Sequence, residues 1–303
     1  MEHEALKLEG LQKRFGRKYA VQEISLEIQR GETYGLVGRN GAGKTTTIRM
    51  INGIIRPDKG MVRTLGVTPA KARNSMGYLP EERGLYPDMS AKDMAAYMGE
   101  LRLLKRKDAL ARAEQRLTAW GIDPKQRIHS LSKGMAQAVQ VIGTTLHDPD
   151  LLTLDEPFSG LDPIAQTKLE AMVQDRRSKG LTTILSTHVM SQAERLCDKI
   201  TIIDNGSVKY SGTMHDARRI LPQKGHVRVS GVSPEEIMLI LGPEAREEEN
   251  MWTFPVSERP GQTSSDLLVE LMKHGRIEDF SIERASLHNV FVHLVGGQQE
   301  VAA

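Results

Sequence analysis

The pattern of apolar and polar residues predicts two kinds of strand in the first half of the chain. Residues 6–9 and 24–28 alternate apolar and polar side chains, which is typical of antiparallel strands with one face in water. Residues 33–37 and 151–154 are short, mostly apolar runs, which are typical of strands buried on both faces. The chain is therefore expected to combine a small antiparallel sheet with a parallel one.

Helical spacing of apolar residues and turn signals place the intervening elements. Apolar residues recur every three or four positions between 90 and 119, and Ser90 fits the N-cap of a helix. Residues 200–203 and 207–210 flank Asn205-Gly206, the dipeptide that most often turns a β-hairpin. A further strand over 181–187 leads directly to His188.

Beyond residue 221 the pattern changes. It predicts strands at 226–230, 251–256 and 277–282, and helices at 234–241, 264–274 and 287–294. If 245–249 also forms a strand, the order is βαββαβ, the split unit of ferredoxin-like folds. The acidic run at 247–250 is equally typical of a solvated loop. We predict a main domain over 1–220 and a small α+β accessory domain over 221–303.

Composition limits the classes of protein. The chain has 303 residues, 39% hydrophobic, and a net charge of +2, so it is expected to be a globular protein without the basic surface of a nucleic-acid binder. Its single cysteine, Cys197, excludes an internal disulfide and suits a reducing cytosol. No signal region opens the chain, and its apolar runs fall short of the ~18 residues that cross a bilayer. Any work at a membrane is expected to need a partner.

Residues 38–46 fit the phosphate-loop pattern G-x-x-x-x-G-K-[ST] between a predicted strand and a predicted helix. Glycines let successive backbone N–H groups face one point, and the helix N-terminus adds partial positive charge there. The lysine can neutralise phosphates, and the threonine after it can hold Mg²⁺. The loop predicts binding of a nucleoside triphosphate by Gly38, Arg39, Asn40, Gly41, Ala42, Gly43, Lys44, Thr45 and Thr46.

Carboxylates and a histidine stand where two further strands end. Asp155 and Glu156 follow the buried run 151–154. Ligands of open α/β sheets bind at the carboxyl ends of strands, so Asp155 is expected to hold Mg²⁺ and Glu156 to polarise the attacking water. His188 ends the strand 181–187 and is the candidate sensor of the γ-phosphate.

The aromatic residue that stacks on the base is left open by spacing alone. Phe15 lies on a turn between the two alternating strands, where it stacks on a nucleotide base or caps the small sheet. Tyr19 is the rival stacking residue.

This ordered set resembles the nucleotide-binding subunit of ABC transporters over residues 6–212. The matching stretches are the phosphate loop, the signature at 131–135, the second nucleotide strand at 151–156, the D-loop at 159–162 and the switch histidine His188. The resemblance makes Phe15 the aromatic of the A-loop. It implies an α/β P-loop NTPase core: a mostly parallel sheet flanked by helices, an antiparallel β subdomain, and a helical subdomain at about 85–140. ATP and Mg²⁺ are the implied ligands.

Two departures from the family pattern affect the site. Glu81 stands where the family usually has a glutamine that reaches Mg²⁺ and the attacking water; a carboxylate can bind both but adds negative charge, and a simple loop acid is the alternative. Lys133 and Met135 replace the commoner glycine and glutamine of the signature. We take Ser132 and Gly134 as its working residues.

The resemblance also implies partners. Two ATP-binding subunits, identical or different, close head to tail, so that each ATP contacts Lys44 of one chain and Ser132 of the other, beside the D-loop residue Asp162. A loop at 81–89 receives a helix of a separate membrane permease, which places the protein on the inner face of the cell membrane. The nearest likeness is to sodium- or drug-export subunits. A dimer-stabilising or regulatory role is expected for the tail.

Three functions follow from these residues. The first is a transport ATPase that hydrolyses ATP to drive a permease. The second is an ABC-type ATPase acting on ribosomes or DNA, which usually has two cassettes or a long coiled-coil insertion, neither found here. The third is a regulatory subunit that binds ATP without hydrolysis; Glu156 and His188 argue against it. We expect the first.

Overall fold

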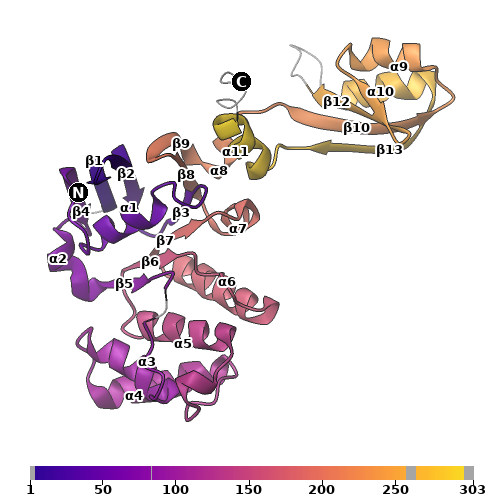
Figure 1. The fold of residues 1–303 in the computed structure, drawn as a ribbon. Coiled ribbons are helices and arrows are strands. Elements are labelled where there is room, and N and C mark those ends of the chain that lie inside the picture. The colour runs from indigo at the N-terminus through magenta and orange to yellow at the C-terminus, as the bar shows by residue number, and fades with distance from the viewer. Residues whose placement is uncertain (1–3, 83, 257–263, 297–303) are drawn as a thin grey trace. The chain divides into compact units, whose positions relative to one another are not determined.

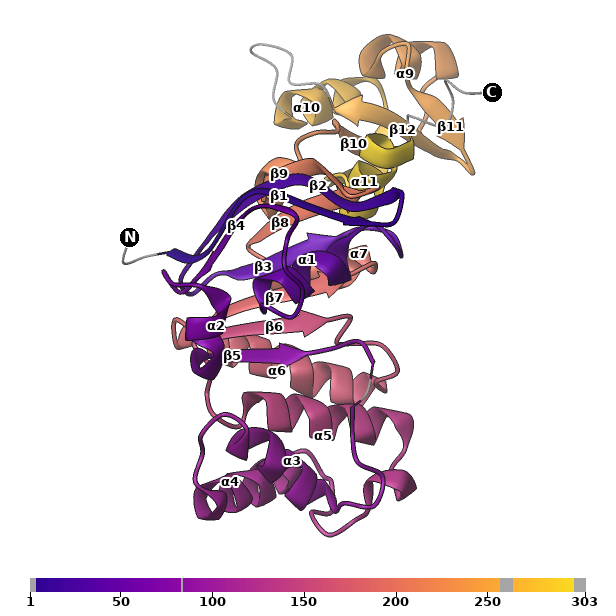
Figure 2. The ribbon, with the colours of Figure 1, turned by 60° about the vertical axis from the view of Figure 1, so that its left-hand side comes forward.

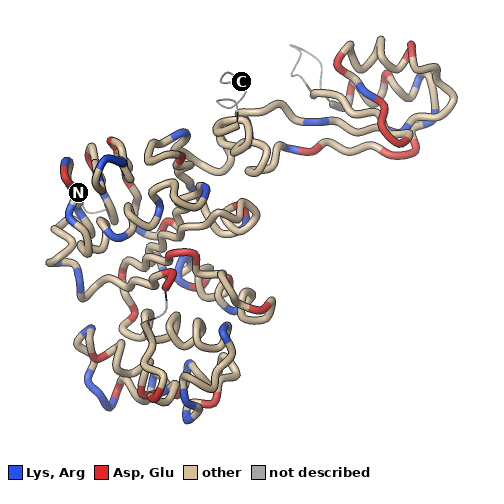
Figure 3. Tube along the Cα trace, in the orientation of Figure 1, with Lys and Arg blue, Asp and Glu red and all other residues tan. Residues whose placement is uncertain are grey.

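The computed structural model describes residues 4–82, 84–256 and 264–296. The contacts between Cα atoms divide the chain into two compact units, Met1–Met214 and His215–Ala303. Figures 1 and 2 show the elements of each unit, and Figure 3 shows basic and acidic residues interspersed along the chain, in keeping with a net charge of +2. Among the described residues, the helices are all too short or too polar to cross a membrane.

The central layer of the first unit is a six-stranded sheet in the order β5-β6-β7-β3-β8-β9. The first five of these strands run parallel, and β9 pairs antiparallel with β8. Every residue of β3, β6 and β7 is buried, as the apolar runs predicted for β3 and β6. Their bounds are β5 (Met76–Leu79), β6 (Leu151–Asp155), β7 (Thr182–Thr187), β3 (Thr33–Val37), β8 (Lys199–Asp204) and β9 (Ser207–Thr213).

An antiparallel sheet in the order β2-β1-β4 packs on the same core. Its strands are β1 (Glu4–Phe15), β2 (Lys18–Gln29) and β4 (Lys59–Thr64), so the alternating pattern predicted the first two correctly. Leu6, Leu8 and Leu11 of β1 share one buried cluster with Ile48 and Met50 of α1 (Lys44–Ile51). This cluster fixes α1, and with it the end of the phosphate loop, against the sheets.

Three helices form a separate cluster below the sheet in Figure 2, around Met94, Ala95 and Val139. They are α3 (Ala91–Glu100), α4 (Arg106–Ala119) and α5 (Lys133–Thr145). Ser90 caps α3 as predicted, since its hydroxyl accepts a hydrogen bond from the Asp93 N–H at 3.0 Å. The helical pattern was expected to continue to 119, but the structure breaks it between α3 and α4, where Leu103 has a φ of 68°.

The remaining elements of this unit connect these layers. The hairpin predicted at Asn205-Gly206 is confirmed: both residues have positive φ, 49° and 77°, as a tight turn between β8 and β9 requires. Helices α6 (Pro163–Ser178) and α7 (Met190–Leu196) follow β6 and β7, and the short elements are α2 (Pro69–Ala72), η1 (Arg73–Ser75) and η2 (Ile128–Ser130). The short helix α8 (Met214–Ala217) begins at the last residue of this unit and continues into the second.

The second unit contains a four-stranded antiparallel sheet in the order β11-β12-β10-β13. Trp252, Phe254 and Val227 of the sheet pack with Ile237 and Leu271 of the two helices. The chain order is the βαββαβ unit predicted if a strand formed near 245–249; it does form, and its three residues are all exposed. The elements are β10 (Gln223–Ser230), α9 (Pro234–Leu241), β11 (Arg246–Glu248), β12 (Met251–Val256), α10 (Ser264–His274), β13 (Arg276–Glu283) and α11 (Leu287–Gly296).

Candidate nucleotide-binding and hydrolysis site

The phosphate loop connects β3 to α1, and two of its glycines are required by close backbone contacts. A Cβ atom at Gly38 would lie 2.3 Å from the Ile203 carbonyl oxygen, and one at Gly43 would lie 2.4 Å from the Ala20 carbonyl oxygen. Gly43 also has a φ of 110°, a backbone conformation that residues other than glycine rarely adopt. The loop is therefore packed between β8 and the hairpin of β1 and β2.

Lys44 begins α1, and its amine turns back over the loop. Its side chain is almost completely buried, and Nζ donates hydrogen bonds to the carbonyl oxygens of Gly38 at 2.8 Å and Arg39 at 3.2 Å. Nζ also lies 3.2 Å from Oε1 of Glu156, as an ion pair. That oxygen accepts no hydrogen bond in the described structure, so Lys44 is held by charge rather than by a directed bond to Glu156. A buried ammonium at this position suits polyphosphate oxygens.

Asp155 is the last residue of β6, beside the end of β7. Its Oδ1 accepts hydrogen bonds from the hydroxyls of Ser186 at 2.6 Å and Thr45 at 3.2 Å. Burial raises the pKa of the Asp155 carboxyl, and these two hydrogen bonds oppose that rise. Its Oδ2 is buried without a hydrogen-bond partner in the described part of the chain. A buried carboxylate oxygen beside a threonine hydroxyl fits a hard divalent cation, so these residues fit Mg²⁺.

Glu156 follows β6 in a left-handed backbone conformation, with a φ of 48°. Non-glycine residues seldom adopt this conformation, and such residues cluster at active sites. Its Oε2 lies 2.9 Å from Nδ1 of His188, whose side chain is half exposed. Lys44, Glu156 and His188 therefore form one chain of contacts from the phosphate loop to the end of β7.

Glu81 lies just after β5 and is exposed. It makes no hydrogen bond or ion pair to any residue that the structure describes. Burial raises the pKa of the Tyr78 phenol, and the charges of Asp155 and Glu81 add to that rise. No contact among the described residues assigns a role to Glu81.

The two candidate aromatic residues lie on the tip of the β1–β2 hairpin. Phe15 is 52% exposed and Tyr19 is 46% exposed. Each carries a cation over its ring: Lys13 Nζ lies 5.6 Å from the Phe15 ring centre, and Arg14 lies 5.5 Å from that of Tyr19. The backbone of Ala20, in the same hairpin, lies against Gly43 of the phosphate loop. The choice between them stays open.

The signature residues form a second group. Ser132 is the N-cap of α5, and its hydroxyl accepts a hydrogen bond from the Met135 N–H at 3.2 Å. Asp162 is the N-cap of α6 and accepts one from the Ala165 N–H at 2.9 Å. A Cβ atom at Gly134 would lie 3.2 Å from the Gly160 carbonyl oxygen and 3.6 Å from Asp162. The structure therefore brings the signature and the D-loop into contact.

The loop predicted to receive a permease is partly packed. Leu85 and Met89 pack against the cluster of α3, α4 and α5, so these two side chains serve local packing. Tyr86 is 55% exposed. The backbone of this loop accepts hydrogen bonds from Ile128 and His129, just before the signature. Arg83, within the same loop, lies outside the described residues.

Ser186 is a site residue that the sequence did not single out. It is fully buried in β7, donates to Asp155, and accepts a hydrogen bond from the Glu156 N–H at 3.0 Å. The available signal was a polar residue inside a buried strand, two positions before His188.

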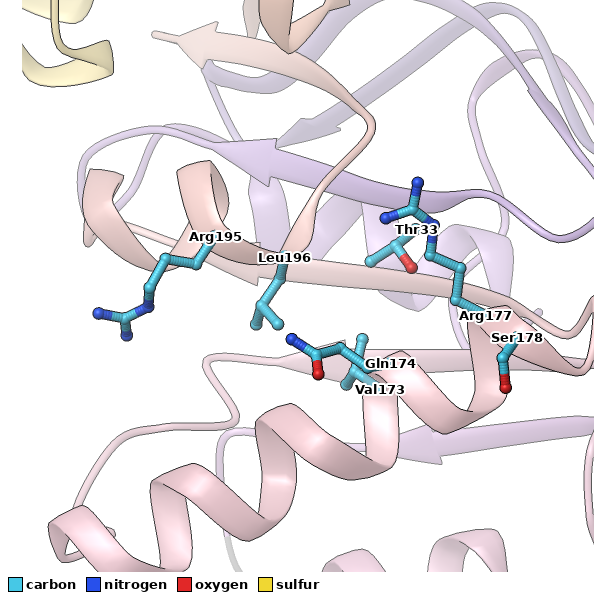
Figure 4. A pocket seen from close by; sticks show the side chains of 7 residues that line it. All are labelled: Thr33, Val173, Gln174, Arg177, Ser178, Arg195 and Leu196. Atoms are coloured by element: carbon cyan, nitrogen blue, oxygen red, sulfur yellow. The ribbon is translucent and has the colours of Figure 1, made fainter.

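A cavity of about 450 Å³ elsewhere in this unit contains none of the predicted site residues (Figure 4). Its two arginines are paired with carboxylates: Arg177 with Asp198, and Arg195 with Glu170. Thr33, the first residue of β3, also lines it, so the cavity lies at the opposite end of β3 from the phosphate loop.

Comparisons with known proteins agree on one family. The family model described as ABC transporter matches residues 21–159. The uncharacterized ABC transporter ATP-binding protein YhaQ of Bacillus subtilis (strain 168) is 33% identical, over 97% of this chain and 100% of that protein. The daunorubicin resistance ATP-binding protein DrrA3 of Streptomyces coeruleorubidus is 29% identical, over 98% of each chain. A solved structure of the ATP-binding subunit of an ABC transporter is 28% identical, with a TM-score of 0.66 over 88% of this chain and 99% of that one.

Proposed function

The chain belongs to the family of ABC transporter ATP-binding proteins, and on that premise we propose that it powers export through a separate membrane permease. It is an ATP-binding subunit and an ATP hydrolase. The observation that carries the proposal is the single chain of contacts from Lys44 through Glu156 to His188, with Asp155 and Thr45 joined beside it.

Each side chain has a chemical role that its surroundings support. Lys44 and the N–H groups of the loop bind the phosphates, because the amine is buried and needs anionic partners. Thr45 and Asp155 would hold Mg²⁺, which would supply charge neutralisation for the phosphates. Glu156 accepts the proton of the attacking water, since its carboxylate is buried and is held between the Lys44 ammonium and the His188 ring nitrogen. His188 orients that carboxylate and reaches the γ-phosphate from the solvent side.

The signature completes the site from a second subunit. Ser132 and Gly134 stand at the N-terminus of α5, where backbone N–H groups favour an anion. Within the described chain no hydrogen bond or ion pair links Ser132 or Asp162 to Lys44, Thr45 or Asp155. We therefore propose a head-to-tail pair, of two copies or of this chain with a similar subunit, in which each ATP lies between one phosphate loop and one signature.

Export and membrane location are the finer parts of the proposal. The relative DrrA3 is named for daunorubicin resistance, and its similarity extends through the second unit as well. We propose that this chain exports a small molecule or ion from the inner face of the membrane, and that Tyr86 and its loop contact the permease. Glu81 is proposed to contact Mg²⁺ or the attacking water.

The test is steady-state ATP hydrolysis with sedimentation in Mg·ATP, for the wild type and Glu156→Gln. The account expects the wild type to turn over and the variant to accumulate as an ATP-bound dimer. Glu170→Gln is a matched control, because it removes a carboxylate paired with Arg195 away from the phosphate loop. Equal hydrolysis by the wild type and Glu156→Gln would overturn the role of Glu156, and absence of an ATP-dependent dimer would overturn the paired site.

A further inference from the structure

Ser186 lies in β7 opposite Asp155 of β6, where the two parallel strands end together. The register pairs the Cα atoms of these two residues directly. The serine is 0% exposed, and a buried hydroxyl is almost always satisfied by protein partners. Its partners therefore show what the hydroxyl does.

Both partners belong to the two adjacent acidic residues. Ser186 Oγ donates to Asp155 Oδ1 at 2.6 Å and accepts from the backbone N–H of Glu156 at 3.0 Å. One hydroxyl thus bonds the side chain of the proposed metal-holding residue and the backbone of the proposed base. Removing the hydroxyl, as in alanine, would leave both groups without this partner.

The bond to Asp155 fixes which carboxylate oxygen is left for a ligand. Oδ1 is occupied by Ser186 and Thr45, whereas Oδ2 is buried without a hydrogen-bond partner in the described chain. A carboxylate held by one oxygen presents the other in a single direction. Outer residues of this kind orient the ligands of metal sites.

The bond to Glu156 supports an unusual backbone conformation. Glu156 follows directly after β6 with a φ of 48°, outside the backbone conformation of a regular strand. Ser186 supplies the acceptor for that N–H. The same backbone conformation sends the Glu156 side chain to Lys44 and His188.

We propose that Ser186 is the positioning residue of this site, which sets Asp155 for Mg²⁺ and Glu156 for water through one hydroxyl. This inference rests on the proposed function, because it assigns Mg²⁺ and ATP to these residues. It predicts a specific defect for Ser186→Ala: weaker coupling between metal and nucleotide, with nucleotide binding itself preserved.

The experiment measures ADP affinity by calorimetry with Mg²⁺ and with EDTA, and takes the ratio of the two. We call the factor by which Mg²⁺ increases ADP affinity the Mg²⁺-dependent gain. Ser186→Ala is expected to reduce this factor about tenfold or more, as loss of a residue that orients a metal ligand does. Its affinity in EDTA should stay within about twofold of wild type, since the phosphate loop is untouched. Ser186→Thr keeps the hydroxyl and should retain the gain.

Thr183→Val is the matched control on the same strand. Thr183 is also fully buried, and its hydroxyl accepts a hydrogen bond from Arg176 Nε at 3.2 Å, at the other end of β7. Thr183→Val removes a buried hydroxyl that lies away from the site, so the Mg²⁺-dependent gain in ADP affinity should not change. If Ser186→Ala does not fold, Ser186→Cys fills similar space with a weaker hydrogen-bonding group and is expected to lose at least about threefold.

A second readout needs neither metal nor nucleotide. Amide hydrogen exchange of the peptide that contains Glu156 should be faster in Ser186→Ala than in wild type and unchanged in Thr183→Val. If Ser186→Ala keeps the same Mg²⁺-dependent gain in ADP affinity as the wild type, the positioning role of Ser186 is overturned and the proposed metal site is not. A wild type that shows no Mg²⁺-dependent gain overturns the proposed metal site as well, so the two failures are distinguishable.

Discussion

The phosphate-loop edge of the sheet and the signature region lie in one compact unit but are built in opposite ways. At the phosphate-loop edge, side chains from several elements contact one another: Lys44 from α1, Glu156 after β6 and His188 after β7. In the signature region, Ser132 and Asp162 bond to the backbone of their own helices. The first is a network, and the second is a pair of helix caps.

The difference indicates where each region acts. A network of buried charges is suited to a charged ligand within its own subunit, since Lys44 and Glu156 already contact each other there. A helix N-terminus with an exposed serine binds an anion brought to it from outside. We infer that the two regions meet through a second subunit, and each change below is expected to damage one region without the other.

The largest expected effect is on the rate of hydrolysis. Glu156→Gln should lower the turnover of Mg·ATP by about 10²–10⁴-fold, because the amide cannot accept the proton from water. A coupled-enzyme assay measures the rate, with Glu170→Gln as the control. Retention of more than about a tenth of wild-type turnover would contradict the role of Glu156.

Nucleotide affinity separates the two regions directly. Lys44→Ala should weaken ATP binding about 10–100-fold, as expected for lost hydrogen bonds to charged phosphates. Ser132→Ala should leave the affinity of the monomer within about twofold. Fluorescence titration at low protein concentration measures both. If Ser132→Ala weakens binding as much as Lys44→Ala does, the signature acts within its own chain and the comparison fails.

A third pair of variants separates the cap from the ligand contact in the signature. Ser132→Ala should lower the free energy of unfolding by about 1 kcal/mol, because α5 loses its N-cap. Ser132→Asp keeps a good cap and should unfold like the wild type, yet its negative charge should prevent ATP-dependent dimers. Urea denaturation and sedimentation test the pair. An Asp variant that dimerises normally with ATP would remove Ser132 from the contact.

The smallest effect concerns the far end of α5, where it meets the parallel sheet. His147 Nε2 bonds to the Met76 carbonyl oxygen at 3.0 Å, and its Nδ1 is buried without a partner in the described structure. Burial lowers the pKa of this imidazole below its usual 6.5. The unfolded chain therefore takes up the proton first as pH falls, and stability decreases below about pH 6.5 by at most about 1.4 kcal/mol per pH unit.

Urea denaturation at pH 7.5 and 5.5, for the wild type and His147→Gln, measures this contribution. The variant should show the smaller decrease on acidification, because glutamine cannot take up the proton. An equal decrease in both proteins would assign the pH dependence to other groups.

The sequence singled out candidate site residues at the ends of patterned elements: Asp155, Glu156 and His188 each end or follow a strand-like run. Three strands of the sheet in the second unit were predicted, whereas the segment of β11 (Arg246–Glu248) was left open between a strand and a solvated loop. The interruption between α3 and α4 was missed, because apolar spacing continues across it.

Other parts required the three-dimensional structure. Ser186 looks like any small residue of a buried strand until β6 and β7 are placed side by side, when it lies opposite Asp155. Phe15 and Tyr19 are still not separated, because both are exposed on the same hairpin near Gly43. Relative placement of side chains from different elements is the information that spacing along one chain does not contain.

The most direct test of the paired site mixes two inactive chains. Lys44→Ala disables the phosphate loop and Ser132→Asp disables the signature, so each alone should hydrolyse almost no ATP. In a mixed head-to-tail dimer, one of the two sites has both residues intact, and the equimolar mixture should recover up to about a quarter of wild-type activity. A mixture as inactive as its components, under conditions in which the wild type turns over, would contradict the account.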